Sequence, residues 1–110
     1  MKLTISDVEL AKMAKAVFTR APNKKANVTL TAVEGSLILR SALGGTMQGA
    51  IITAAGEVVV PAQAFVKVVE SFRGTGFIEI NAGADGLRLN SFKMPVLSWN
   101  PVPMMPEEFR

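Results

Sequence analysis

Histidine, cysteine and tyrosine are all absent from this 110-residue sequence, which removes much of the usual chemistry of active sites. Without histidine there is no side chain that ordinarily shuttles protons near neutral pH. Without cysteine there is neither a disulfide framework nor a thiolate nucleophile, and without tyrosine there is no phenolic acid. A serine nucleophile would need lysine or a carboxylate as its base, and no serine stands in a nucleophile-elbow or Ser-x-x-Lys arrangement. We therefore predict that the protein is not an enzyme.

Segments that direct a chain to or across a membrane are absent as well. No apolar run approaches the roughly 18 residues that a membrane helix needs. The N-terminus has one lysine but no apolar stretch before Asp7 and Glu9, so it does not have the pattern of a signal peptide. The lack of cysteine fits a reducing compartment. We therefore expect a cytoplasmic location and no membrane partner.

Neither the acidic residues nor the glycines form a pattern that binds a metal or a phosphate. Asp7 and Glu9 fall in the first turn of a predicted helix, where the helix dipole favours acids. The glutamates at 107–108 are interpreted as a solvated pair in the C-terminal tail. The glycines at 44–45 and 74–76 lack the following helix that would direct its N–H groups at a phosphate. We expect no metal site and no cofactor.

The composition is apolar and only mildly basic. Hydrophobic residues make up 49% of the chain and the mean hydropathy is +0.32, so another subunit is expected to cover part of the apolar surface. The 12 Lys and Arg residues exceed the 9 Asp and Glu residues by a net charge of +3. This balance permits an acidic partner without requiring one, so the placement of the charges matters more than their total.

The sequence contains one pattern of elements that occurs twice. An apolar segment precedes an amphipathic stretch, and two runs of alternating apolar and polar residues follow it. Segment 3–5 matches 58–60, and segment 8–18 matches 62–72. Segment 28–31 matches 77–80, and segment 37–41 matches 87–91. Within the amphipathic stretches, Leu10 aligns with Phe65, so Lys12 corresponds to Lys67. We therefore predict one domain at 1–100, with internal repeats at 1–53 and 57–100.

Each amphipathic stretch carries start and stop signals of a helix. Ser6 and Glu9 form a capping box, and the first helix is expected to run to about Arg20. Pro61 suits the first turn of the second helix, and Gly74 ends it. The apolar residues recur at the helical period of 3.6 and are expected in the core. They are Leu10, Met13, Ala14, Val17, Phe18 and Ala21 in the first helix, and Phe65, Val68, Val69 and Phe72 in the second.

Turn residues and proline set the boundaries of the strands. Gly35 marks the tip of one predicted hairpin, where a positive φ is required. A third strand is expected at 47–52 and a last one at 92–99, in which Pro95 cannot donate to a ladder. These two strands are therefore the expected edges of the sheet. Residues 101–110 are typical of an extended, proline-rich tail.

Together these patterns predict an α+β fold with two β-α-β-β-β repeats and both helices on one face of an antiparallel sheet. Phe77 is expected to join the core. Unpaired edge strands invite pairing with another chain, and a head-to-tail contact forms a ring when the rotation closes. We therefore expect a homo-oligomer joined through edge strands, with a hexameric ring and a dimer as the two candidate assemblies.

Basic residues gather on the two predicted helices and in the loops after them. If both helices share a face, these residues can contact the backbone of a nucleic acid without reading its sequence. An ordinary solvated helix face also carries lysine, and Glu70 lies on the same face, so the pattern leaves both interpretations open. The basic set consists of Lys12, Lys15, Arg20, Lys24, Lys25, Lys67 and Arg73.

Several segments in a fixed order resemble the bacterial DNA sliding clamps, which are the beta subunit of the replicative DNA polymerase. The most specific is GEVVVPA at 56–62, followed by FVKVVESF at 65–72, which is similar to the strand-Pro-Ala-helix block of the clamps. IEI at 78–80 and GLRLNS at 86–91 resemble their closing hairpin. The chain is most similar to the first clamp domain, because MKLTI resembles its start and MPEEF its passage into the next domain.

This resemblance implies a fold and a function. Clamps of this family close a ring from about six such domains, with helices along a basic channel, and they do no chemistry. They act in DNA replication as processivity factors, holding a polymerase on duplex DNA by topology. The resemblance would place Lys12, Lys15 and Lys67 in the channel, with the rest of the basic set near its rim. Duplex DNA, bound without sequence preference, and replication proteins are the implied partners.

The chain also departs from the family. A bacterial clamp chain has three domains, whereas this one corresponds to the first, as a free-standing relative or an excised domain. The family's groove for partner peptides lies mainly in its last domain, so no residue here inherits it. Glu70 stands on the face that should be positive. The alternative hypothesis is therefore a clamp-fold interaction or regulatory module that contacts proteins and does not bind DNA.

Overall fold

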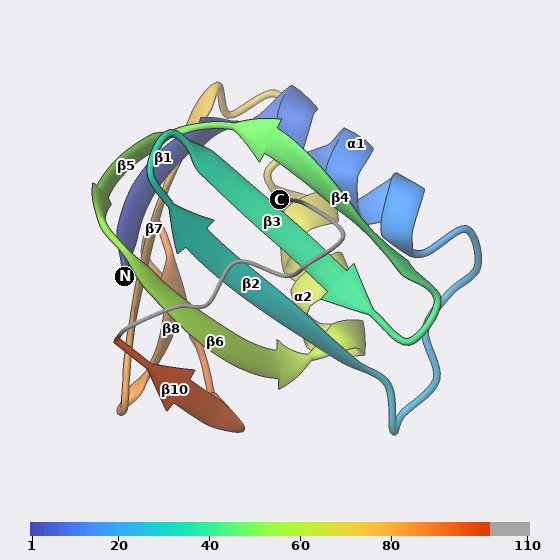
Figure 1. Cartoon of the computed structure of the whole chain (residues 1–110). Helices are drawn as coiled ribbons and strands as arrows, with labels where there is room; N and C mark the ends of the chain where they lie inside the picture. Colours follow the sequence, from blue (N-terminus) through green and yellow to red (C-terminus); the bar gives the residue numbers. More distant parts are fainter. Residues whose placement is uncertain (102–110) are drawn as a thin grey trace.

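The computed structural model describes residues 1–101 (Figure 1). The expected tail at 101–110 therefore lies outside the described residues, apart from Pro101. The described chain forms two helices and ten strands. In chain order they are β1 (Lys2–Ser6), α1 (Asp7–Val17), β2 (Asn27–Val33), β3 (Ser36–Ser41), β4 (Gly44–Gly49), β5 (Ile51–Ala54), β6 (Gly56–Pro61), α2 (Ala62–Ser71), β7 (Phe77–Gly83), β8 (Gly86–Leu89), β9 (Phe92–Met94) and β10 (Ser98–Asn100).

The described strands form two antiparallel sheets, whereas the sequence patterns predict a single sheet. The first sheet has the order β5-β1-β7-β8-β9, and the second has the order β10-β6-β2-β3-β4. Each sheet combines two strands of one repeat with the three-stranded meander of the other, because β1 pairs with β7 and β6 pairs with β2. The first strand of each repeat therefore completes the sheet of the other repeat.

Both helices lie on one side of the second sheet, behind it in Figure 1. Helix α1 packs against β3 and β4, α2 packs against β2 and β6, and the two helices pack against each other. The expected α+β class, with both helices on one face, is therefore confirmed. Each repeat contributes one helix to this layer.

The helices follow the predicted start signals more closely than the predicted ends. The Ser6 hydroxyl accepts a hydrogen bond from the Glu9 N–H at 3.2 Å, as expected for an N-cap. Helix α1 ends at Val17 rather than near Arg20, because the backbone of Phe18 leaves helical geometry while its side chain stays in the core. The chain then turns outward, so Ala21 is exposed and its predicted burial is wrong.

The two predicted edge strands are each divided in two. The segment 47–52 breaks at Ala50, whose N–H donates to the Gly35 carbonyl at 3.1 Å, and forms β4 and β5. The segment 92–99 breaks around Pro95 and forms β9 and β10. In both cases the chain passes from one sheet to the other. All four short strands are sheet edges, so the expected position of the edges is confirmed.

The core lies between the sheets and the helices, and strand alternation decides which side chains enter it. Ile78 and Ile80 of β7 are fully buried, and Phe65 of α2 packs in the same cluster. Phe77 precedes Ile78 on the strand, so its side chain points to the opposite face and is 71% exposed. The expected burial of Phe77 is therefore wrong.

Gly56 at the start of β6 provides a test of this packing. A β-carbon added there would lie 2.7 Å from the Trp99 ring and 2.9 Å from Met1 Cβ. Because such crowding displaces packed side chains, we expect Gly56→Ala to lower the free energy of unfolding by about 1–3 kcal/mol in urea denaturation. Gly49→Ala is the control, because its added methyl meets nothing closer than 3.9 Å. Equal effects of the two substitutions would contradict the predicted clash.

Candidate nucleic-acid interface

The first turn of α1 is attached to the loop that follows α2. The Asp7 N–H donates to the Gly76 carbonyl at 2.7 Å, and the Asp7 carboxylate accepts from the Gly74 N–H at 2.7 Å. Asp7 is buried, so its carboxylate is committed to this contact. The sequence had suggested only a helix-dipole role for Asp7, since nothing local indicates a partner 67 residues further along the chain.

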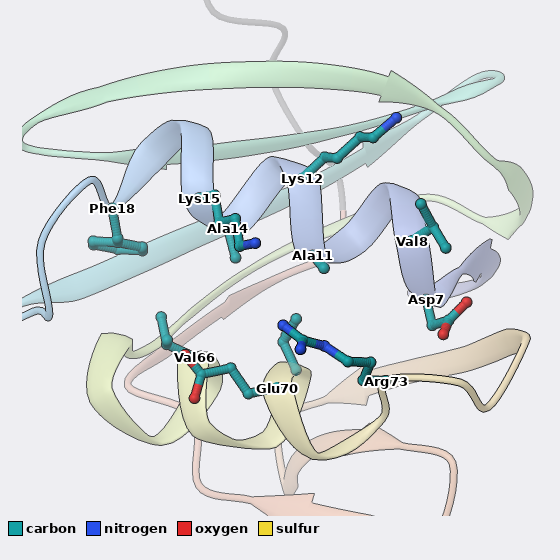
Figure 2. A pocket seen from close by; sticks show the side chains of 11 residues that line it. Asp7, Val8, Ala11, Lys12, Ala14, Lys15, Phe18, Val66, Glu70 and Arg73 are labelled. Carbon is teal, nitrogen blue, oxygen red and sulfur yellow. The ribbon is translucent and has the colours of Figure 1, made fainter.

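The first turn of α2 is attached in the same way to the loop that follows α1. The Ala62 N–H donates to the Ala26 carbonyl at 3.0 Å, and Gln63 Nε2 donates to the Pro22 carbonyl at 2.9 Å. Figure 2 shows that the two helices run antiparallel, so each N-terminus lies beside the C-terminal end of its neighbour. These contacts at both ends hold the helices as one layer.

A groove with a volume of about 530 Å³ lies between α1 and α2 (Figure 2). Its apolar lining comes from Val8, Ala11, Ala14, Phe18, Val66 and Val69, and we call it the interhelical groove. Its charged lining residues are Asp7, Lys12, Lys15, Glu70 and Arg73. Sequence patterns do not predict this groove, because it forms only where the two helices meet.

The structure places every member of the basic set on the surface. Lys12, Lys15 and Arg73 line the interhelical groove, although Lys12 points away from α2 in Figure 2. Lys67 is exposed on α2, and Arg20, Lys24 and Lys25 are exposed in the loop after α1. Within residues 1–101, the ion pairs join Arg40 to Glu57 and Lys93 to Asp85, so no member of the basic set is paired.

The charges are distributed unequally between the two sides of the fold. Across residues 1–101, the helices and the loops that follow them carry seven basic and three acidic residues, whereas the strands and their turns carry four of each. The acids on the helical side are Asp7, Glu9 and Glu70, and Asp7 is buried. The mild basic excess of the sequence is therefore concentrated on the helical side.

Glu70 interrupts this positive surface. In the match between the repeats, Glu70 corresponds to Lys15, and both line the interhelical groove from opposite helices. A carboxylate at this position would repel a phosphate, since like charges at short distance disfavour each other. The helical side is thus basic in the loop after α1, which carries Arg20, Lys24 and Lys25, and of mixed charge in the groove.

Other kinds of site find no support in the described residues. No group of three or more His, Cys, Asp or Glu residues within 1–101 is placed to hold a metal ion. Neither α1 nor α2 is long and apolar enough to cross a membrane, and no other helix is present in the described part of the chain.

Comparisons with solved structures identify the fold. The chain superposes on the DNA polymerase III beta subunit of Caulobacter crescentus with a TM-score of 0.73 and 23% identity, over 98% of this chain and 33% of that one. The DNA polymerase III beta subunit sliding clamp of Bartonella birtlesii gives a TM-score of 0.72 at 20% identity, and the DNA polymerase III beta subunit of Pseudomonas aeruginosa gives 0.64 at 21% identity. Each comparison covers 97% of this chain and 33% of the clamp.

These comparisons confirm the resemblance to sliding clamps at the level of the fold. The chain spans about a third of the length of the solved clamps, so it corresponds to one clamp domain. No protein-family model matches the sequence, and no curated protein matches it. The two helices, the interhelical groove and the basic set are therefore parts of a domain with the clamp fold.

The attachment of the helices can be tested at Asp7. Replacing Asp7 with Ala leaves the Gly74 N–H without its acceptor, so we expect the free energy of unfolding to fall by about 1–3 kcal/mol. Asp7→Asn keeps an amide oxygen in place and should cost less. Thermal and urea denaturation of both variants would measure the difference. An asparagine variant as unstable as the alanine variant would show that the charge, rather than the hydrogen bond, is what matters.

Proposed function

We propose that this protein is a sliding-clamp-like DNA-binding protein whose helical side contacts the backbone of duplex DNA without reading its sequence. The observation that carries the proposal is the separation of charge: the unpaired basic set lies on the helical side, while the strands carry balanced charges. The clamp-domain fold supports it, because the solved structures of the same fold are sliding clamps of DNA polymerase.

The side chains available on the helical side suit phosphates better than bases. Lysine ammonium groups are mobile point charges, and their contacts with phosphates release counterions whatever the base sequence. Bidentate recognition of adenine requires an Asn or Gln side chain. Gln63 of α2 instead donates to the Pro22 carbonyl, so its amide is already engaged within the fold. This inventory lacks a free reader of adenine, and its lysines suit the DNA backbone.

The proposed mechanism is topological rather than chemical. One domain cannot surround a duplex, and the fold leaves edge strands in both sheets through which copies can join. We propose a homo-oligomer joined through these edges, with a closed ring as its complete form. It would act as a processivity factor in DNA replication, in the cytoplasm, with replication proteins as partners and without catalytic activity.

A second candidate function has its own supporting observation. The interhelical groove has an apolar lining and contains Glu70 opposite Lys15, which is a poor surface for a polyanion. Such a groove suits a protein segment that brings apolar side chains together with charges of both signs. The alternative proposal is therefore an interaction module that uses the clamp fold without binding DNA.

Salt dependence separates these two functions. We expect duplex affinity to fall steeply with salt, and the double variant Lys12→Ala, Lys67→Ala to reduce the slope of log affinity against log salt by about 1.8, since each phosphate contact contributes about 0.9. The charge reversals Lys12→Glu and Lys67→Glu together should abolish binding. Fluorescence anisotropy with a labelled duplex at several salt concentrations measures both effects.

The matched control reverses two charges on the sheet side. Lys2 and Arg88 are exposed on strands of the first sheet and form no ion pair within residues 1–101, and Lys2→Glu with Arg88→Glu changes the net charge by the same amount. This variant should retain most of the binding. If both double variants lose affinity equally, the contact is not localised to the helical side. If the unmodified chain binds neither linear nor circular duplex in a salt-dependent way, the interaction module is the correct function.

The assembly is tested independently of DNA. We expect light scattering at micromolar concentration to show an oligomer, and Phe92→Lys to shift it toward monomer, because a lysine on edge strand β9 opposes strand pairing. Phe77→Lys is the control, since Phe77 is also exposed and apolar but lies on the interior strand β7. If the unmodified chain is strictly monomeric, the proposed ring is wrong, and most of the support for the encirclement of DNA is lost.

A further inference from the structure

The interhelical groove exposes apolar side chains on the charged helical side of the fold. Buried side chains of both helices form its floor, and Val8, Ala11 and Val66 line it with part of their surface exposed. Val8 is 58% exposed, although it is a branched apolar residue in the first turn of α1. An apolar patch surrounded by charged groups is typical of a surface that another molecule covers.

The shape of the groove suits a helix better than an extended segment. Both of its sides are α-helices, whose inner N–H and C=O groups are bonded within the helix, so no ladder is open to an extended peptide. A helix satisfies its own backbone groups and can lay one face of side chains into such a groove. Ala11 and Ala14 lie about one turn apart on α1, and their small side chains permit a close approach.

The free charges along the groove are mostly positive. Lys15 lines it from α1 and Arg73 lines it from α2, and the Arg73 guanidinium extends toward α1 in Figure 2. Neither forms an ion pair with another residue of 1–101. Asp7 is bound to the Gly74 N–H, so among the described lining residues Glu70 is the carboxylate left to a partner. A partner that complements these charges is therefore acidic.

We propose that the interhelical groove binds an acidic amphipathic helix of a partner protein. The helix places apolar side chains, spaced three and four residues apart, against Ala11, Val66 and the groove floor. Its carboxylates lie beside Lys15 and Arg73. Since α1 has 11 residues and is therefore about 16 Å long, the bound helix has about three turns. This inference names the partner of the interaction module proposed above and rests on that function.

Duplex DNA is the other occupant that the charges allow. Its backbone presents phosphates and sugars, which cannot replace the apolar contacts that would cover Val8. A phosphate in the groove would also be repelled by Glu70. The groove therefore favours the acidic helix over the duplex. Because both occupants use Lys15 and Arg73, a bound helix would compete with a bound duplex.

Peptides of about 12 residues test the chemistry of the partner. The probe is a helical peptide with leucines spaced three and four residues apart and glutamates beside them. One control peptide has the same composition in an order without an apolar face, and a second has lysine in place of each glutamate. In NMR titrations of the 110-residue chain, we expect the probe to bind about tenfold or more tightly than either control. Equal affinity for the three peptides would overturn the proposal.

A matched pair of substitutions on α1 tests the location of the site. Ala11 lines the groove, whereas Ala16 is exposed on the same helix and does not line it. Ala11→Gln places a long polar side chain in the groove, so we expect it to weaken probe binding about tenfold or more. Ala16→Gln should leave the affinity unchanged. If Ala11→Gln does not fold, Val8→Gln takes its place, because Val8 is largely exposed.

Two further results would contradict the proposal in different ways. If the Ala11→Gln and Ala16→Gln variants bind the probe equally well, the groove is not the site, and the interaction module uses another surface. If no peptide binds while duplex DNA binds with the expected salt dependence, the interaction module itself is wrong. Both substitutions keep every charge of the chain, so neither should change the salt slope of duplex binding.

Discussion

The exchange of strands between the two repeats is the constraint on which the rest of the structure depends. Because β1 pairs with β7 and β6 pairs with β2, neither sheet can be completed within one repeat. The two helices start directly after these exchanged strands, so their positions are set by the same pairing. Contacts from Asp7 to the loop after α2, and from Gln63 to the loop after α1, then fix the two helices relative to each other.

This arrangement explains how a small basic excess becomes a localised feature. Each repeat contributes one helix to a common layer, so lysines far apart in the sequence, such as Lys12 and Lys67, reach the same side of the fold. The strands carry charges that balance, and two of their basic residues are paired with acids. The same antiparallel contact also brings Lys15 and Glu70 to one groove, so the symmetry of the backbone is not matched by symmetry of charge.

The similarity to sliding clamps is one of architecture rather than of sequence. Identities of 19–23% accompany TM-scores of 0.64–0.73 over nearly the whole chain. Such a fold is specified by apolar periodicity, by caps and by turns, which many sequences satisfy. Functional surfaces depend on particular residues instead, and for this reason the fold is established while the contacts with DNA and with other copies are proposals.

The sequence by itself determined the two helices, most of the strands and the sheet edges, because caps such as Ser6, breaks such as Pro95 and the two apolar periods are local properties. It also identified an exposed basic set, since charged residues off the apolar stripe of a helix face solvent. Only the tertiary structure decided the exchange of strands, the partner of Asp7 and the interhelical groove. Each of these joins residues distant in sequence, and hydrophobic periodicity shows which face of an element is buried but not what covers it.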